Sequence, residues 1–199
     1  MEDEAVKLDR HIAGRVRELR IKHGLSLDAL ARNSGVSRSM ISLIERGESS
    51  PTAAVLHRLA IALSTTLASL FDPPKTAAKL TGGPLARRVD QPEWRDPGSG
   101  YVRRNVSPPA VRQPMQIIEV HFPPGKRVAF ESHGRDQRVY QQVWVLEGAI
   151  NITLGAEHHR LEQGDCLAMQ LDQPIVFHNP ARKAARYAVV IVSEPRLKR

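Results

Sequence analysis

The chain has 199 residues, of which 41% are hydrophobic, as is usual for a globular protein of one or two domains. Its single cysteine, Cys166, excludes an internal disulfide framework and any multi-cysteine metal site, and is typical of a reducing compartment. The first residues, MEDEAVKL, lack an apolar signal core, and no apolar run approaches the roughly 18 residues of a membrane span. We therefore expect a cytoplasmic protein with no membrane contact.

The net charge of +8 is unevenly distributed along the chain. Residues 1–72 contain 10 Lys and Arg against 9 Asp and Glu, a net of +1, whereas residues 73–199 contain 19 against 12, a net of +7. We favour a solvated surface that aids solubility as the reason for this excess. An anionic ligand and contacts with a nucleic-acid backbone remain as alternatives.

Residues 25–63 predict three short helices separated by turns. Ser26 is the expected N-cap of the first helix, and Ser34-Gly35 ends it at a sharp turn. Ser37 is the expected N-cap of the second helix, which hides Ile41 and Ile44 on one side. Its other side is polar or solvent-facing, with Arg38, Ser39, Ser42 and Leu43.

The third helix of this segment is expected to follow Gly47. Ser50 would cap it and Pro51 would occupy its first turn. Its buried stripe consists of Val55, Leu56, Leu59, Ala60 and Leu63. A short helix exposed between two packed helices, with small polar and basic side chains at its N-terminal end, has the form needed to enter a DNA major groove.

These residues resemble the helix-turn-helix of the Xre family, which includes the lambdoid phage repressors. The resemblance extends from about Leu8 to Phe71 and implies an all-α domain of five helices, with the sequence LASLF as the fifth. It also implies a partly buried ion pair between Arg20 and Glu45. The family usually carries Gln at the position of Leu27, so one phosphate contact is lost here.

We predict that Ser37, Arg38, Ser39, Ser42 and Leu43 face the major groove of a double-stranded operator and that Arg46 lies near phosphate. Arg38 would favour a guanine, and Leu43 could touch a thymine methyl group. A helical hairpin that packs on another protein is the alternative interpretation.

The helical period ends after Phe71, where prolines and glycines become frequent. The sequence therefore predicts a helix-turn-helix domain over residues 1–72, a Pro/Gly-rich linker and lead-in over 73–104, and a second domain over 105–199. Trp94 suggests that the end of this linker already packs against the second domain.

From about Met115 onward the chain predicts an antiparallel sandwich or small barrel. Short runs rich in Val, Ile and aromatic residues are separated by Gly and Pro turns, and these runs are MQIIEVHF, RVYQQVWVL, INITL, CLAMQL, PIVFH and RYAVVIVS. The expected fold class is α+β multidomain, with all-α and all-β domains in that order.

Two segments resemble the two motifs of the cupin family, which implies a double-stranded β-helix barrel over roughly residues 105–193. Gly125 opens FPPGKRVAFESHGRDQRVYQQVWVLEGAINITL, which looks like motif one. The segment LEQGDCLAMQLDQPIVFHNP looks like motif two. In metal-binding cupins these motifs supply three His and one Glu. The matching positions here are Glu131, His133, Gln141 and Ile175.

Only Glu131 and His133 of these four residues are good ligands, so we expect no bound metal, no cofactor and no catalytic residue. The other histidines give little support for a metal site. His178 should point to the opposite strand face from Ile175, His158 and His159 should lie in a turn, and His121 should end a strand.

Without a metal, the barrel becomes a candidate pocket for a small-molecule effector. The predicted effector-binding residues are Glu131, His133, Gln141, Ile175 and Phe177. Val143 and Val145 should share the inward face of Gln141. These side chains could instead simply fill a packed barrel, and we favour that reading for Val143, Val145 and Phe177. We expect Cys166 to be a small buried hydrophobe.

Together these features predict a transcriptional regulator, with repression favoured by family analogy, that binds DNA as a homodimer and responds to an effector. Some cupins with the same helix-turn-helix are non-haem iron oxygenases, so a metal-dependent enzyme is the alternative. Such an enzyme needs two His and one carboxylate, which this chain lacks at the motif positions. A protein-interaction module is a third possibility.

Overall fold

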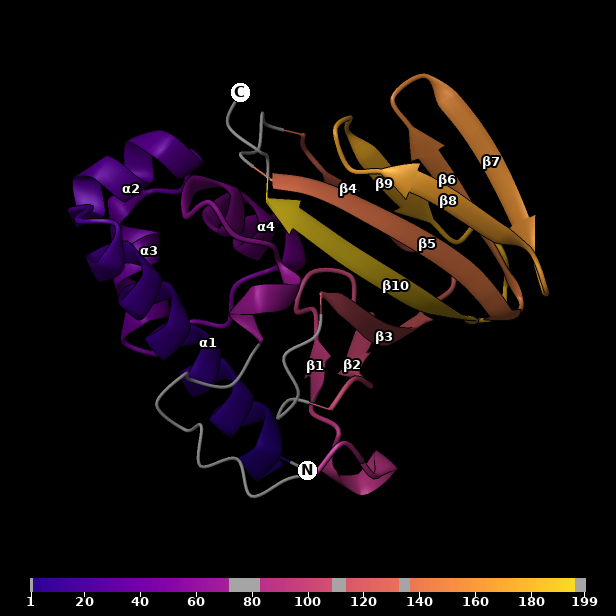
Figure 1. The fold of residues 1–199 in the computed structure, drawn as a ribbon, viewed down its shortest axis with the longest axis horizontal. Helices are drawn as coiled ribbons and strands as arrows, with labels where there is room; N and C mark the ends of the chain where they lie inside the picture. Colours follow the sequence, from indigo (N-terminus) through magenta and orange to yellow (C-terminus); the bar gives the residue numbers. More distant parts are fainter. Residues whose placement is uncertain (1, 72–82, 109–113, 133–136, 196–199) are drawn as a thin grey trace. The chain divides into compact units, whose positions relative to one another are not determined.

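The structure is a computed structural model that describes residues 2–71, 83–108, 114–132 and 137–195. The chain divides into two compact units, residues 1–81 and 82–199. The first is helical and the second is built from β-strands (Figure 1). In the described part of the chain, no helix has the length and apolar character needed to cross a membrane.

The first unit contains four α-helices in its described residues: α1 (Glu2–Lys22), α2 (Leu27–Ser34), α3 (Arg38–Glu45) and α4 (Ala53–Ala62). Their shared core is made of aliphatic side chains at helical spacing. Fully buried members include Ile12, Val16, Leu30, Ile41, Leu56 and Leu59. The buried positions of each helix therefore follow the predicted apolar stripes.

The expectation of five helices was wrong, because LASLF forms only the short 3-10 helix η1 (Ala68–Leu70). Its backbone bonds join residues three apart, as between Phe71 N–H and the Ala68 carbonyl at 3.0 Å. The Thr66 hydroxyl accepts a hydrogen bond from Ser69 N–H at 3.1 Å and so caps this turn. This three-residue segment is too short to form the hydrogen bonds between residues four apart that define an α-helix.

The caps of α2 and α3 confirm the sequence prediction, but the start of α4 does not. Ser26 and Ser37 accept hydrogen bonds from Ala29 N–H and Met40 N–H, respectively. Helix α4 is capped by Thr52, not by Ser50, and Pro51 lies outside the helix. Thr52 has the extended backbone of an N-cap, and its hydroxyl reaches Val55 N–H at 3.4 Å.

The second unit consists of two antiparallel sheets. The six-stranded sheet has the order β1-β2-β3-β10-β5-β8, and the four-stranded sheet has the order β4-β9-β6-β7. The strand bounds are β1 (Glu93–Arg95), β2 (Val102–Asn105), β3 (Met115–Phe122), β4 (Arg127–Phe130), β5 (Gln137–Glu147), β6 (Ala149–Leu154), β7 (Glu157–Glu162), β8 (Cys166–Gln170), β9 (Ile175–His178) and β10 (Ala185–Pro195). Two antiparallel sheets are the architecture that the cupin resemblance implies.

Strands β1 and β2 lie within the segment predicted to be linker and lead-in. They are part of the six-stranded sheet, and β1 is its edge strand, where nearby prolines are tolerated. Trp94 is buried and packs edge-on against Tyr101, with ring centroids 5.9 Å apart. The predicted packing of Trp94 is therefore confirmed.

A chain of aromatic rings fills much of the interior of the second unit. Tyr101 stacks on Phe122 at 5.7 Å, and Tyr187 lies 6.4 Å from Phe122 and 6.0 Å from Phe177. Burial raises the pKa of both tyrosines above its ordinary value of 10, so both hydroxyls are neutral at physiological pH. The core is thus continuous from the six-stranded to the four-stranded sheet.

Two local predictions in this unit were wrong. His158 and His159 are residues of β7, because the turn before it is only Gly155-Ala156. Cys166 is exposed, because its strand register places it opposite Trp144 on the solvent side of the larger sheet. Neither outcome could be read from composition, since both depend on which residues pair across strands.

Candidate DNA-binding surface and barrel interior

The turn between α2 and α3 holds the second helix outward. Gly35 adopts a left-handed conformation, with φ of 65°, and its N–H bonds the Ala31 carbonyl at 2.9 Å. The buried Ser34 hydroxyl donates to the Leu30 carbonyl at 2.7 Å and accepts from Val36 N–H at 3.2 Å. These bonds fix the sharp turn that the Ser-Gly pair predicted.

Helix α3 presents a polar end to solvent and buries its opposite side. Ile41 and Ile44 are buried, whereas Ser37, Arg38 and Ser39 are exposed. Ser42 and Leu43 are half-buried, so the central part of the predicted surface is less open than its N-terminal end. The assignment of these residues to DNA stays a prediction.

The arginines of this surface have carboxylate partners in the free protein. Arg38 Nε lies 3.2 Å from Asp28 Oδ1, and both side chains are largely exposed. Arg46 forms two 2.8 Å bonds with Glu48, which raise the pKa of Arg46 and lower the pKa of Glu48. Exposed pairs of this kind stabilise a protein only weakly, so either arginine can exchange its partner at small cost.

Sequence reasoning did not assign Met40, which is also exposed on α3. Its sulfur lies 3.8 Å from the Ser49 hydroxyl, beyond the end of the helix. Met40 is three residues before Leu43, the spacing that places two side chains on neighbouring parts of one helix surface. That spacing could have identified Met40 as part of the exposed face.

A buried ion pair connects α1 to the end of α3, as predicted. Arg20 Nε and Nη2 donate to the two carboxylate oxygens of Glu45 at 2.6 and 2.7 Å. The third donor of Arg20, Nη1, bonds the Leu25 carbonyl at 2.9 Å. The hydrogen bonds from Arg20 to Glu45 raise the pKa of Arg20, so its guanidinium stays charged at physiological pH. This contact fixes the C-terminal end of α3 against α1.

The predicted effector residues fall into three groups in the structure. Gln141, Ile175 and Phe177 are buried, and Glu131 is exposed. His133 lies outside the described residues. Phe177 contacts two neighbouring rings and therefore belongs to the aromatic core.

Strand alternation places the inward residues as predicted. Val143 and Val145 are buried on the same side of β5 as Gln141. His178 is on the opposite side of β9 from Ile175 and lines an outer depression of about 380 Å³. The depression also includes Arg127, Asn151 and His158, and none of the five predicted effector residues lines it.

The residues at the cupin metal positions do not fit a metal centre. Ile175 is a hydrocarbon and Gln141 offers only a neutral amide, so the motif positions cannot supply a two-His, one-carboxylate triad. Among the residues with described positions, no group of three or more His, Cys, Asp or Glu side chains could hold an ion.

The chain is similar to known regulators over most of its length. Residues 16–70 match the helix-turn-helix family. The HTH-type transcriptional regulator SutR of Escherichia coli is 24% identical over 197 residues, covering 92% of this chain and 96% of SutR. An uncharacterized HTH-type transcriptional regulator of Archaeoglobus fulgidus is 32% identical over 57 residues, covering 29% of this chain and 81% of that protein.

The two-unit fold also matches a solved structure. The crystal structure of an HTH_3 family transcriptional regulator from Vibrio cholerae has 27% identity and a TM-score of 0.73, covering 96% of this chain and 99% of that one. Both the exposed α3 and the β domain that follows it in the sequence thus lie in regions shared with that protein. The chain therefore belongs to the Xre-type helix-turn-helix transcriptional regulators.

Proposed function

We propose that this protein binds a specific operator through the N-terminal end of α3 and that its second domain binds a small-molecule effector. The main support for DNA recognition is the placement of Arg38 and its serine neighbours on an exposed helix end whose other side is anchored by buried Ile41 and Ile44. A recognition helix contacts base edges with such N-terminal residues.

Two copies acting together are part of this proposal. One helix of eight residues can contact only a few base pairs, and helix-turn-helix proteins gain affinity and specificity by placing two such helices in successive major grooves. An effector would act by changing the population of dimers with the correct spacing. Repression is the favoured sign of regulation.

The enzyme alternative has less support. An iron oxygenase reaction would need ligands that Gln141 and Ile175 do not provide. The buried amide of Gln141 is better suited to orienting a bound molecule, because a pocket of mostly apolar side chains uses a few polar groups for this purpose. The proposed effector site consists of Gln141, Ile175 and Phe177 together with Glu131 and with His133, which lies outside the described residues.

Selection of DNA fragments from a random duplex pool tests the proposed function. The full-length protein should enrich a two-fold symmetric sequence whose half-sites are separated by about 10 base pairs or a multiple of it. Arg182→Ala removes an exposed arginine of the second domain and serves as the control for loss of one positive charge when an arginine of α3 is replaced. Binding that shows no sequence preference at any salt concentration would contradict the proposal.

A further inference from the structure

The solvent side of the four-stranded sheet carries a row of polar side chains that crosses all four strands. The strand registers align one residue each from β4, β9, β6 and β7, in that order, and these are Arg127, His178, Asn151 and Arg160. Their strand neighbours Phe177 and Ile152 are buried, so alternation along the strands directs the row outward. We call these four residues the outer polar row.

The outer polar row lines the outer depression of about 380 Å³. The next row of the same sheet face adds Val176, Thr153 and His158 to the lining. This volume is at the small end of the range of small-molecule pockets. No Asp or Glu is among the described residues that line the depression. The lining therefore combines two permanent positive charges, from Arg127 and Arg160, with neutral hydrogen-bonding groups.

Most of the outer polar row has no partner within the protein. Among the residues with described positions, the side chains of Arg127, Asn151 and His178 form no hydrogen bond or ion pair. Arg160 Nη2 lies 3.2 Å from Glu162 Oε1, and both side chains are more than half exposed. Such an exposed pair is weak and exchanges easily. The row therefore keeps its donors available for a ligand.

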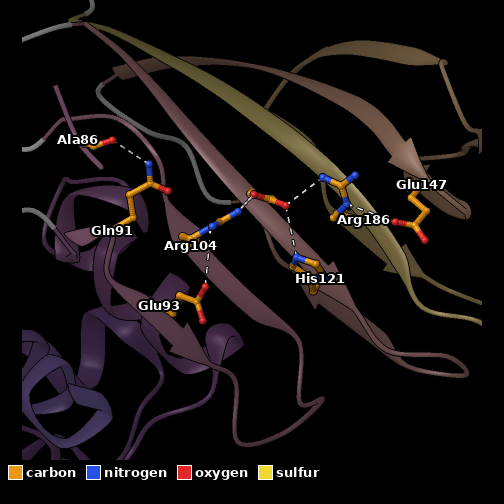
Figure 2. A network of polar contacts seen from close by, with 8 residues as sticks. Ala86, Gln91, Glu93, Arg104, His121, Glu147 and Arg186 are labelled. Carbon is orange, nitrogen blue, oxygen red and sulfur yellow. Dashed lines mark hydrogen bonds and ion pairs between the residues drawn. The ribbon is translucent and has the colours of Figure 1, made fainter. Parts of the chain in front are cut away.

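The arginines of the six-stranded sheet are different, because acidic side chains already neutralise them, as Figure 2 shows. Glu119 contacts both Arg104 and Arg186, the latter at 3.2 Å. Glu147 lies 3.4 Å from Arg186 Nε. A bound anion would have to displace these carboxylates. The outer depression, with no carboxylate among its described lining residues, is therefore the better place for an anion.

We propose that the outer depression binds the phosphate group of a small molecule, either free phosphate or a phosphate monoester. Arg127 and Arg160 are at opposite ends of the row, with backbones about 14 Å apart across three strand spacings. Both side chains can extend toward the middle of the row, over His178 and Asn151. Guanidinium, imidazole and amide N–H groups all donate hydrogen bonds to phosphate oxygens. This site lies outside the barrel interior and goes beyond the proposed function.

His158 adds a further donor from the neighbouring row. Its Nδ1 lies 3.0 Å from the Thr153 hydroxyl oxygen. When the hydroxyl donates this bond, the neutral imidazole carries its hydrogen on Nε2. Nε2–H is then available to a phosphate oxygen. A bound anion would thus favour the arrangement in which Thr153 is the donor.

Charge favours a phosphate monoester or free phosphate over other anions. A monoester carries about −1.5 to −2 near neutral pH, which matches the two arginines of the row. A carboxylate and a DNA phosphodiester each carry only one negative charge. The half-buried Val176 in the lining offers an apolar contact to the carbon part of a monoester. The net charge of +7 on residues 73–199 also attracts anions to this domain.

Isothermal titration calorimetry of the full chain with phenyl phosphate, at constant ionic strength, tests the site. Arg127→Gln should weaken binding by about tenfold or more, because it removes a charge-assisted hydrogen bond. Arg138→Gln is the matched control, since it removes an exposed strand arginine of the six-stranded sheet and should leave the affinity unchanged. Glu162→Gln should tighten binding, because it frees Arg160. Far-ultraviolet circular dichroism verifies that each variant is folded.

Nuclear magnetic resonance of the wild type gives the position of the bound phosphate. Phenyl phosphate should shift the backbone amide signals of Asn151, Arg160 and His178 most strongly. Shifts centred on α3 would show that the probe occupies the DNA-binding surface instead. Shifts centred on Gln141 would place the probe inside the barrel. Either of these two results would overturn the proposed site.

Further probes separate the two sources of phosphate and the remaining failures. Tighter binding of phenyl phosphate than of inorganic phosphate would identify a monoester site, and equal affinity a site for free phosphate. No binding of either at roughly 10 mM would overturn the proposal. Equal affinity for acetate, or displacement of phenyl phosphate by a random DNA duplex, would also overturn it. None of these results bears on operator selection, so the proposed function is tested separately.

Discussion

Arg38, which we propose to contact a base edge, pairs in the free protein with Asp28 of the preceding helix. The pair holds the guanidinium near the helix start without burying it. Binding to guanine would replace one carboxylate with two acceptors on a base edge. The exposed ion pair thus positions Arg38 at little energetic cost.

We expect Arg38→Ala to weaken operator binding by about 1–3 kcal/mol and to relax specificity at one base pair. Competition binding with the selected operator and with single-base variants measures both effects. Arg182→Ala is again the charge control. If affinities for operator and random DNA fall equally, Arg38 contacts phosphate, and its assignment to a base is wrong.

Arg20→Ala should destabilise the helical domain by about 2–4 kcal/mol, because it leaves Glu45 largely buried without its partner. Arg17→Ala, at an exposed position of the same helix, is the control and should stay within about 0.5 kcal/mol. Urea unfolding followed by far-ultraviolet circular dichroism measures both. A similar small loss in Arg20→Ala would show that the pair adds nothing to stability.

Single residues were predictable from the sequence where their roles are local. Ser26 and Ser37 cap helices because a hydroxyl there meets an amide three residues later, a relation within one turn. The Arg20–Glu45 pair, which spans 25 positions, came only from resemblance to a family. The exposure of Cys166 depends on the pairing of β8 with β5, and no local pattern specifies that register.

At the level of elements, the end of β3 contains a histidine, His121, whose charged form the fold disfavours. Burial and the nearby Arg186 and Arg104 lower the pKa of His121 below its ordinary 6.5, despite its contact with Glu119. As the pH falls below about 6.5, the unfolded chain therefore takes up a proton that the folded chain resists. The second domain should lose stability through this pH range.

His121→Gln should remove part of this acid sensitivity. Between pH 7.5 and pH 5.5 the stability of the variant should fall less than that of the wild type, because the variant has no imidazole at this position to protonate. Tryptophan fluorescence during urea unfolding isolates the second domain, since both tryptophans, Trp94 and Trp144, belong to it. His158→Gln controls for loss of a histidine. Identical pH profiles for His121→Gln and the wild type would contradict this account.

Elements with a clear apolar period were predictable, and those without one were not. The runs that became β3, β5 and β10 are rich in β-branched residues, which favour strands. Strand β7, with the sequence EHHRLE, gave no such signal and forms because β6 offers a free edge to pair with. The 3-10 helix η1 was also not predictable from a local pattern, because tertiary packing overrides helix propensity in so short a segment.

At the level of the whole molecule, the proposed sensor should function without a transition metal. Purified protein should contain less than about a tenth of an equivalent of iron, zinc or manganese. Stoichiometric metal held by Glu131, His133 and a third ligand would favour the enzyme alternative. Elemental analysis of protein purified without chelators or added metal distinguishes the two.

The effector site makes a separate prediction for Gln141. A small molecule that co-purifies with the protein should raise the melting temperature of the wild type and change its operator affinity. Gln141→Leu should lose both responses while the apo domain stays as stable or becomes more so, because an apolar side chain suits the buried position. Val143→Leu is the packing control. An unchanged response in Gln141→Leu would place the effector elsewhere.

The position of β10 has a consequence for how the protein is made. This strand lies between β3 and β5, so the two halves of the larger sheet join only through a segment translated after both of them (Figure 1). The helices are complete by residue 71 and make mostly local contacts, which fold quickly. During synthesis, the helical DNA-binding unit can therefore fold on the ribosome before the second domain, whose larger sheet is incomplete until β10 has been translated. A ribosome that stalled before residue 185 would carry a folded helix-turn-helix domain without a complete second domain.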